Sequence, residues 1–398
     1  MESRAAHFCS EIDKLHAKLL INVGVTTDWQ RAEKEINQYV HSDLLQPANS
    51  HQEILNRIES IILEIVTSLS KAEAPVLALP NRSSWANISF DSAIGLQMSS
   101  RQSVTTIRAD CPSSVTKFGE KMNFYFFSHN SVCLHRDIYY NNTKLFGSQK
   151  AVDSIVDDIS CMLKVPRRSL HVLATSKGLI SGDLCYMEED GTRIDCHSSS
   201  TAVSVSSNIS GIKNIVSSAK FVLIIEKDAT FQRLLDDDFC TKISPCIIIT
   251  GKGVPDVNSR LMVKRLWDEL HIPIFALVDA DPHGIEIMCI YKYGSVAMSF
   301  EAHSLTVPSV MWLGLLPSDL QRLRVPKDAL IPLTKRDESK LCSLLERPYL
   351  TSQPEWQKEM KLMQQSKVKA EIQSLTAIAP DFLTQIYLPN KLRYGGWI

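Results

Sequence analysis

Hydrophobic residues in the first part of this chain recur at helical spacing. One set predicts an amphipathic helix between residues 54 and 69 (Ile54, Ile58, Ile61, Ile62, Ile65 and Leu69). Its apolar face either packs on its own domain or binds a partner. A second set predicts a helix that Pro166 ends (Val152, Ile155, Val156, Ile159 and Leu163).

After Pro166 the pattern becomes that of short strands. Segments 169–175 and 182–187 are predicted strands, and Asp190-Gly191 is a hairpin turn that leads to a returning strand over 193–196. Helices followed by a hairpin wing favour a small α+β domain of the winged-helix type, over about 95–210. Four cations with no acid between them follow its helix: Lys164, Arg167, Arg168 and Lys177. Such a patch suits DNA phosphates, although a solvated face has the same composition.

Beyond residue 211 buried strands alternate with helices. Apolar runs at Phe221–Ile225, Cys246–Thr250 and Ile274–Val278 are predicted strands, and an amphipathic helix over 257–270 separates the last two. This order predicts an α/β domain with a parallel sheet covered on both faces, over 211–398. Residues 1–94 form a separate N-terminal region that carries the first helix. The aromatic, Gly-containing end, 388–398, is expected to dock on the domain.

Composition and charge exclude several classes of protein. The chain has 398 residues, of which 44% are hydrophobic, so it is neither collagen-like nor disordered throughout. Its 43 basic and 44 acidic residues give a net charge of −1, which excludes a DNA-packaging protein with an overall basic charge but permits a local basic face. The apolar runs are too short to span a membrane. Ten cysteines without a Cys-x-x-Cys pair signal neither a zinc finger nor a disulfide framework, and a reducing intracellular compartment is expected.

Carboxylates follow two of the predicted parallel strands. Glu226 comes just after the first strand, and Asp279 and Asp281 follow the strand over 274–278. Residues i and i+2 of an extended segment share a face, and ligands bind beyond the carboxyl ends of parallel strands. Three carboxylates there suit Mg²⁺ better than zinc. Asp281-Pro282 is equally typical of a helix N-cap followed by proline at the first helical position.

These residues carry a resemblance to a known family. Glu on one strand and Asp-x-Asp on a later one is the arrangement of a Toprim domain. The stretches that begin at Glu226 (Glu-Lys-Asp-Ala-Thr-Phe), at Thr250 (Thr-Gly-Lys-Gly-Val-Pro-Asp) and at Val278 (Val-Asp-Ala-Asp-Pro-His-Gly) resemble the topoisomerase VI A-subunit family. The resemblance covers about 53–398 and is closest to the meiotic branch, which initiates recombination by breaking DNA; from Arg136 onward it suggests an animal orthologue.

The resemblance implies a catalytic tyrosine. Arg136-Asp-Ile-Tyr-Tyr140-Asn is similar to the family's nucleophile motif, in which the second tyrosine attacks DNA, so this role carries over to Tyr140. The reaction is covalent catalysis that leaves a phosphotyrosine link and a free 3′-hydroxyl. Arg136, at i−4, shares a helix face with Tyr140 and could hold the phosphate. Tyr139 is expected to pack or orient. Alone, two adjacent aromatic residues would be ordinary core residues.

The same resemblance implies the wider function. It predicts a homodimer with composite sites that breaks double-stranded DNA at meiotic chromosomes in the nucleus. Glu226, Asp279 and Asp281 would bind Mg²⁺, with Glu226 also exchanging protons with the leaving oxygen. Lys177 and Arg168 are the main candidates for phosphate contacts. Partners would be a topoisomerase VI B-like protein, through the helix over 54–69, and other meiotic break proteins, with no membrane.

One departure from the family keeps two alternatives open. The segment 117–135, which precedes the tyrosine motif, lacks the apolar helical periodicity of relatives and contains Gly119. In one alternative the chain is a non-cleaving DNA-binding scaffold of the break machinery. In the other, the Toprim site performs nucleotidyl transfer or metal-dependent hydrolysis without a covalent step. Loss of covalent DNA capture would favour the first, and activity that survives Tyr140→Phe would favour the second.

Overall fold

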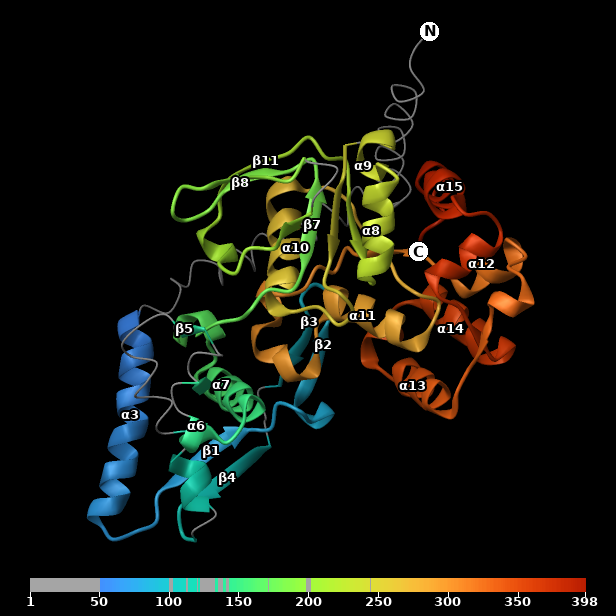
Figure 1. Ribbon diagram of the computed structural model, residues 1–398. Coiled ribbons are helices and arrows are strands. Elements are labelled where there is room, and N and C mark those ends of the chain that lie inside the picture. Colours follow the sequence, from blue (N-terminus) through green and yellow to red (C-terminus); the bar gives the residue numbers. More distant parts are fainter. Residues whose placement is uncertain are drawn as a thin grey trace, which may run out of the picture. The chain divides into compact units, whose positions relative to one another are not determined.

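The structure is a computed structural model in which the described chain forms two compact units. It describes residues 51–99, 103–111, 114–119, 121, 133–134, 139–140, 143–170, 172–197, 202–243 and 245–398. One unit contains the described residues up to Thr175 together with 295–303, and the other contains 176–294 and 304–398. Helix α3 in the first unit and strand β7 in the large sheet of the second are labelled in Figure 1.

The first unit is built on two helices, both predicted from the sequence. Helix α3 spans His51–Ser70 and helix α7 spans Gln149–Leu163. Helix α7 begins where the Ser148 side chain accepts a hydrogen bond from the Ala151 N–H, and it ends at Lys164 in a left-handed conformation. The other elements are short: β1 (Val76–Pro80) pairs with β4 (Val104–Arg108), β2 (Ile88–Asp91) with β3 (Gly95–Met98), and β5 (Cys133–Leu134) with β6 (Val172–Leu173); α6 spans Thr143–Phe146.

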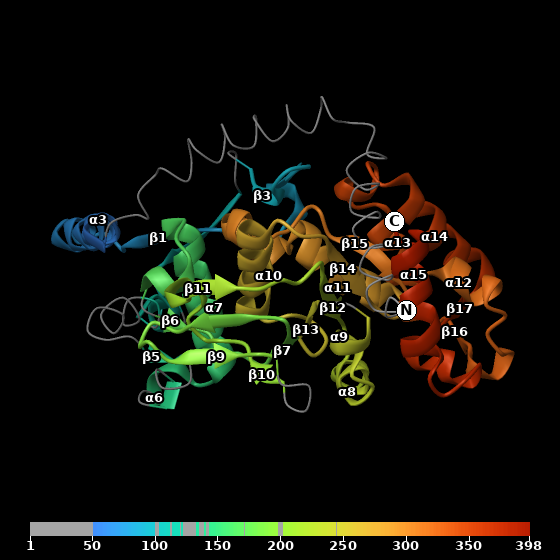
Figure 2. The same ribbon diagram turned by 90° about the horizontal axis from the view of Figure 1, so that it is seen from above.

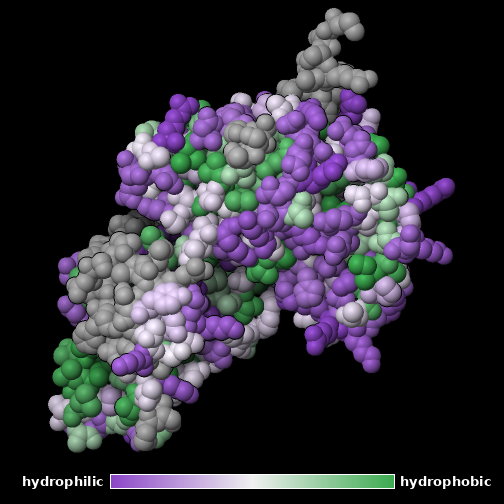
Figure 3. All heavy atoms as spheres, in the orientation of Figure 1, coloured by the Kyte–Doolittle hydropathy of each residue, from purple (hydrophilic) through white to green (hydrophobic). Residues whose placement is uncertain are grey.

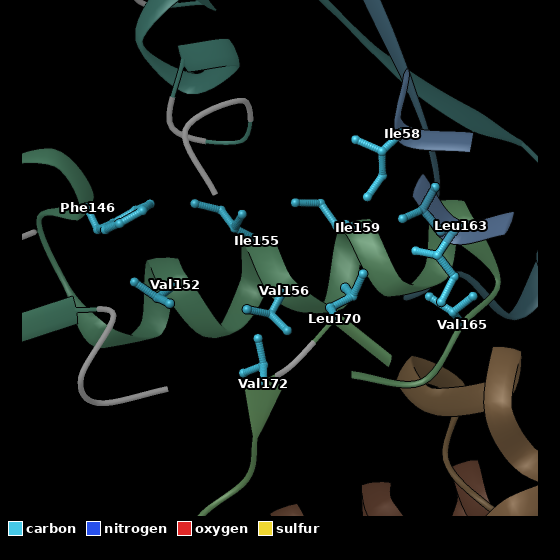
Figure 4. Packing of buried hydrophobic residues seen from close by; sticks show 11 residues of the cluster. Ile58, Phe146, Val152, Ile155, Val156, Ile159, Leu163, Val165, Leu170 and Val172 are labelled. Atoms are coloured by element: carbon cyan, nitrogen blue, oxygen red, sulfur yellow. The ribbon is translucent and has the colours of Figure 1, made fainter. Parts of the chain in front are cut away.

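The apolar face of α3 packs inside its own unit. Ile54 and Ile58 join the α7 side chains in one buried cluster, which Figure 4 shows from close by. Ile65 is 8% exposed and packs with Leu77 and Leu79 in a second cluster, and Ile61 contacts both. Of the two sequence-based interpretations, core packing therefore holds for this face. Leu69, which was predicted on this same face, is exposed instead, as are Leu63 and Val66, and Figure 3 shows apolar surface over the lower part of the helix.

The second unit contains a six-stranded sheet in the order β10-β7-β13-β12-β14-β15. The central strands β12 (Val222–Ile225), β13 (Ile247–Thr250) and β14 (Ile274–Leu277) are fully buried and parallel, as predicted, and β15 (Met311–Gly314) extends the parallel set. Strands β7 (Leu179–Gly182) and β10 (Val203–Ser204) complete one edge in antiparallel pairing. The sheet is thus mixed, with a parallel centre.

Helices cover both faces of this sheet, as Figure 2 shows. Helices α8 (Asp228–Asp236) and α9 (Phe239–Lys242) lie on one face and α10 (Val257–Leu270) on the other. Opposite faces follow from right-handed crossovers, because the chain moves outward from β12 to β13 and then back to β14. Helix α11 spans Pro282–Tyr293, and four more helices follow: α12 (Pro317–Arg322), α13 (Lys335–Leu345), α14 (Pro354–Ser366) and α15 (Leu388–Tyr394).

The C-terminal end docks on the sheet, as predicted. The backbone of Ile398 exchanges two hydrogen bonds with Trp312 of β15, at 2.7 and 3.1 Å. The Trp397 ring packs on Phe275 of β14 with centroids 4.9 Å apart. No helix in the described part of the chain is both long enough and apolar enough to cross a membrane.

The predicted hairpin is present, with two differences around it. Strands β8 (Cys185–Met187) and β9 (Arg193–Asp195) pair across the turn that contains Gly191, at φ +87°, and β11 (Lys213–Val216) joins them in a three-stranded sheet. The strand predicted over 182–187 breaks because Gly182, at φ +114°, lies against the Cys246 carbonyl. The strand predicted over 169–175 shortens to β6, since residues 167–170 form a 3₁₀ turn. The winged-helix fold stays a prediction.

Candidate active site

Two parallel strands place the acidic residues side by side at the carboxyl ends of the sheet's central strands. Ile225 and Leu277, the last residues of β12 and β14, are register partners, so Glu226 and Asp279 emerge at nearly the same level. The Glu226 Oε2 atom accepts a hydrogen bond of 2.8 Å from the Asp279 N–H. Both side chains are buried, at 7% and 2% exposure. The sequence pattern of strand-end carboxylates therefore corresponds to a real cluster.

Asp279 is held from two other directions. Its Oδ2 atom lies 2.7 Å from the Lys227 ammonium, which also contacts Glu371 Oε1 at 3.1 Å. Its Oδ1 atom accepts a hydrogen bond of 2.9 Å from the Ile372 N–H. The C-terminal segment thus fixes the orientation of a carboxylate that lies about ninety positions earlier in the chain.

Asp281 is the N-cap of helix α11. Its Oδ1 atom accepts a hydrogen bond of 2.6 Å from the Gly284 N–H, and Pro282 occupies the start of the helix. The capping interpretation is therefore correct for one oxygen of this carboxylate. A capping aspartate at a helix N-terminus still presents its second oxygen, so the two interpretations are compatible.

Gly284 has no side chain, and the acidic residues occupy the space that a side chain would fill. A Cβ atom at this position would lie 2.8 Å from Glu226 Oε2 and 2.7 Å from the Asp279 carbonyl oxygen. Both distances are shorter than a real Cβ contact. Only glycine lets the first turn of α11 approach the carboxylates this closely.

The clustering changes the acidity of these groups. Burial, and then the neighbouring Asp279 carboxylate, raises the pKa of Glu226 to about 8. Burial also raises the pKa of Asp279, against the opposing hydrogen bond from Lys227. Carboxylates gathered in this way repel one another, and a single ammonium only partly compensates them. The site is thus short of positive charge.

A glycine-containing loop, 251–253, lies beside Glu226. The Gly253 N–H donates to the Glu226 carbonyl over 2.8 Å, and Gly253 has φ +88°. Gly251 could not carry a side chain, because a Cβ atom would lie 2.9 Å from both Pro255 and the Tyr291 hydroxyl. Lys252, between the two glycines, is exposed and lies 3.5 Å from Asp228.

The two tyrosines of the first unit differ in their surroundings. Tyr139 is partly buried against the α7 cluster, whereas the Tyr140 side chain is 68% exposed. Their rings lie 5.4 Å apart at an angle of 56°. Tyr139 thus anchors on the core, and Tyr140 is accessible to a large substrate. Arg136 and most of the segment 117–135 lie outside the described residues.

Comparison with known proteins gives the family. Residues 221–392 match the Toprim domain of the topoisomerase 6 A-subunit/Spo11 family, and residues 127–172 match the family described as "Type IIB DNA topoisomerase". The human "Meiotic recombination protein SPO11" is 62% identical over 88% of this chain and 89% of its own length, and the mouse protein of the same name is 60% identical over the same shares. The chain belongs to the topoisomerase 6 A-subunit/Spo11 family. The A-subunit of DNA topoisomerase 6 from Arabidopsis thaliana is 34% identical over 87% of the chain and 81% of its own length.

This family membership confirms the resemblance and the Toprim fold inferred from the sequence. A Toprim domain typically binds a divalent metal ion. The donor set fits such an ion: the ligands offered are carboxylate oxygens, the described cluster is short of positive charge, and Gly284 lets helix α11 lie close against it. The carboxylates of Glu226, Asp279 and Asp281 do not, however, form a group whose ligand atoms all lie within 4.8 Å of one another. Among the described residues, such a group is formed by Cys185, Asp195 and His197.

The four predicted phosphate-binding cations of this Spo11-family chain have different environments. Arg167 is ion-paired with Asp157, and its Nε donates to Asp157 Oδ1 over 2.6 Å, so its charge is largely compensated. Lys164 and Arg168 are exposed in the first unit. Lys177 is exposed in the second unit, where its ammonium donates to the Lys252 carbonyl over 3.2 Å.

Three residues of the Toprim site were missed from the sequence. Lys227 stands next to Glu226, but nothing in the sequence shows that it turns toward Asp279. Glu371 is too distant in sequence for any local pattern to connect it to the site. The signal for Gly284 was available, since it is the glycine of the Asp-Pro-His-Gly stretch that carried the resemblance.

Proposed function

We propose that this chain makes DNA double-strand breaks in meiosis by transesterification, with Tyr140 as the nucleophile. The Tyr140 Oη attacks a backbone phosphorus, the bond from phosphorus to the 3′-oxygen breaks, and the 5′ end remains attached to the tyrosine. The phenolic proton leaves, and the 3′-oxygen gains one to become a hydroxyl. The bond energy is kept in the phosphotyrosyl link, so neither ATP nor hydrolysis is needed for the cut.

The observation that carries this proposal is the family match in both parts of the chain, around Tyr140 and around the acids. Three further features support it. Tyr140 is exposed while Tyr139 is anchored on the core. The carboxylates of Glu226 and Asp279 meet at the carboxyl ends of two strands, where Gly284 lets helix α11 approach them closely. Burial raises the pKa of Glu226 to about 8, in keeping with a role in proton exchange with the leaving 3′-oxygen.

Mg²⁺ is the ion we propose for this site, held by Glu226, Asp279 and Asp281. When bound, it would neutralise charge on the reacting phosphate and on the leaving oxygen. Lys227 must release the Asp279 Oδ2 atom for metal coordination, and Glu371 can then retain the ammonium. Asp281 keeps its capping bond to Gly284 and offers its other oxygen.

The assembly we propose is a homodimer acting on double-stranded DNA in the nucleus. Tyr140 of each protomer would serve the acidic site of its partner, so that each protomer cuts one strand. Arg168, Lys164 and Lys177 are exposed for phosphate contacts, whereas Arg167 mainly holds Asp157. A topoisomerase VI B-like protein would dock on the exposed stripe of α3 formed by Leu63, Val66 and Leu69, alongside other meiotic break proteins.

The experiment is recovery of DNA covalently attached to the protein from meiotic cells that express wild type, Tyr139→Phe or Tyr140→Phe. We expect adducts from wild type and from Tyr139→Phe, and none from Tyr140→Phe. Wild-type protein that binds chromosomes without any adduct would support the non-cleaving scaffold instead. Breaks that persist in Tyr140→Phe but vanish in Asp279→Ala would support a metal-dependent nuclease.

A further inference from the structure

The β8–β9 hairpin carries a second group of metal-ligating side chains, unrelated to the Toprim acids. Cys185 and Asp195 are cross-strand register partners, and His197 follows Asp195 by two residues. One ligand atom from each of the three lies within 4.8 Å of the others. Cys185 is half-buried, and Asp195 and His197 are exposed.

The sulfur–nitrogen distance within this group matches an edge of a tetrahedral metal site, and the oxygen–nitrogen distance is shorter than such an edge. The Cys185 Sγ atom lies 3.5 Å from His197 Nδ1, and Asp195 Oδ1 lies 2.8 Å from the same nitrogen. Zinc bonds of about 2.3 Å to sulfur and 2.0 Å to nitrogen, at a tetrahedral angle, place S and N about 3.5 Å apart. A small shift of the carboxylate would complete three ligands around one point.

The histidine is already oriented for this role by a fourth side chain. The other ring nitrogen, Nε2, forms a short hydrogen bond with Asp183 Oδ1. Asp183 is itself fixed, because its Oδ2 atom accepts hydrogen bonds from the Ser218 N–H, at 2.8 Å, and from the Ser218 hydroxyl. A ligating histidine commonly donates its second N–H to a carboxylate, which sets the tautomer and leaves the first nitrogen free for the metal.

The group is separate from the candidate active site. Ser218 precedes strand β12 and Glu226 follows it, so the two lie at opposite ends of the same strand. Asp183, His197 and Ser218 also line a cavity of about 310 Å³, whose lining includes neither Cys185 nor Asp195. The Arg193 guanidinium donates to the Cys185 sulfur over 3.9 Å, a long contact that a bound cation would displace.

We propose that Cys185, Asp195 and His197 bind a divalent transition-metal ion of the zinc class, with water as the fourth ligand and Asp183 as the positioning residue for His197. A mixed set of thiolate, imidazole and carboxylate ligands selects zinc over magnesium. Binding displaces the thiol proton of Cys185 and any second proton on His197, so metal uptake releases protons.

The test is titration of the full-length, metal-stripped chain with Co²⁺, followed in the ultraviolet and visible. We expect one Co²⁺ per chain to give a thiolate-to-cobalt absorption band that Zn²⁺ removes. Cys185→Ser and His197→Gln abolish the band. The matched variant Cys342→Ser, which changes an exposed cysteine elsewhere, and Asp279→Asn, in the Toprim site, both retain it. Asp183→Asn should weaken Co²⁺ binding roughly 10- to 100-fold.

A second measurement needs no variant. Zn²⁺ should protect Cys185 of the wild-type chain from alkylation, read by mass spectrometry, while Cys342 stays reactive. Absence of the thiolate band, its persistence in Cys185→Ser, or equal alkylation of Cys185 with and without Zn²⁺ would each overturn the proposal.

Discussion

The Lys227 ammonium lies 2.7 Å from Asp279 Oδ2, so among the described residues it is the cation paired with the carboxylate that we propose as a metal ligand. Asp279 is nearly inaccessible to solvent, and Lys227 is only 30% exposed. The ammonium therefore compensates the buried carboxylate in the metal-free chain, and under the proposed function it would compete with a metal ion for that carboxylate.

Lys227→Met should separate these two effects. We expect the metal-free variant to lose about 1–3 kcal/mol of unfolding free energy, because Asp279 loses its partner. Added Mg²⁺ should then raise the melting temperature more than it does for wild type. Thermal melts with and without Mg²⁺ measure both. Lys358→Met, which removes an exposed 3.8 Å pair with Glu355, serves as the control and should change neither value appreciably. An unchanged response of Lys227→Met to Mg²⁺ would rule out competition.

Gly284→Ala tests the space beside the acids. The added methyl would displace Glu226 Oε2 or the Asp279 backbone, and a displacement of about 1 Å can lower a rate about 100-fold. We therefore expect covalent DNA adducts to fall by about two orders of magnitude in meiotic cells at normal protein level. Gly119→Ala is the matched control, since a Cβ atom there would meet none of the described residues within 4 Å. Normal adduct yield from Gly284→Ala would mean that the acids tolerate the displacement.

The exposed stripe of α3 predicts a partner interface. Glutamate at Leu63 and Val66 should reduce pull-down of a B-like partner at least tenfold, because it places charge on an apolar contact surface, and it should leave the chain soluble. Ser68→Glu adds one of these charges on the opposite side of the helix from Val66 and should leave pull-down intact. Ile65→Glu buries a charge in the core and should prevent folding altogether. Undiminished pull-down from the double variant would place the partner elsewhere.

Lys292 predicts a pH-dependent stability. Burial lowers its pKa from 10.5 to about 8 while its ammonium donates to the carbonyls of Pro308 and Val310. Between about pH 8 and 10.5 the unfolded chain holds a proton there that the folded chain has lost, so the unfolding free energy from this group rises with pH, by at most about 3 kcal/mol.

Denaturant unfolding at several pH values, compared between wild type and Lys292→Met, measures this contribution. The stability difference should grow in favour of wild type across the window. The corresponding difference for Lys361→Met, at an exposed position, should stay flat. A flat difference for Lys292→Met would show that the buried ammonium keeps an ordinary pKa.

The sequence predicted the parallel strands and the strand-end acids because both depend on local patterns. Short apolar runs that alternate with helices are typical of strands in a sheet covered on both faces, and a carboxylate just after such a strand is expected at its carboxyl end. The sequence could not decide whether the apolar face of α3 packs on its own unit or binds a partner, because both require the same spacing, and only the contact of Ile65 with Leu77 and Leu79 decides between them.

Contacts that depend on strand register or on segments distant in sequence could not be predicted from the sequence. Cys185 and Asp195 are neighbours only because β8 and β9 pair in one particular register. Their proximity to each other and to His197 leaves no spacing motif in the sequence, such as Cys-x-x-Cys, that would predict it. Glu371 reaches Lys227 only after helices α11 to α14 have folded back on the sheet.

The Ile372 N–H donates to Asp279 Oδ1, and Ala280 pairs with Ala370. The surroundings of Asp279 therefore depend on residues that are synthesised about ninety positions after it. A ribosome that has synthesised residues 1–369 has made Glu226, Asp279 and Asp281 but not the backbone that holds Asp279 in place. We therefore expect the surroundings of Asp279 to form only after residues 370–372 have been synthesised. Under the proposed function, a nascent chain that stops short of them would carry the acids without the backbone that orients Asp279.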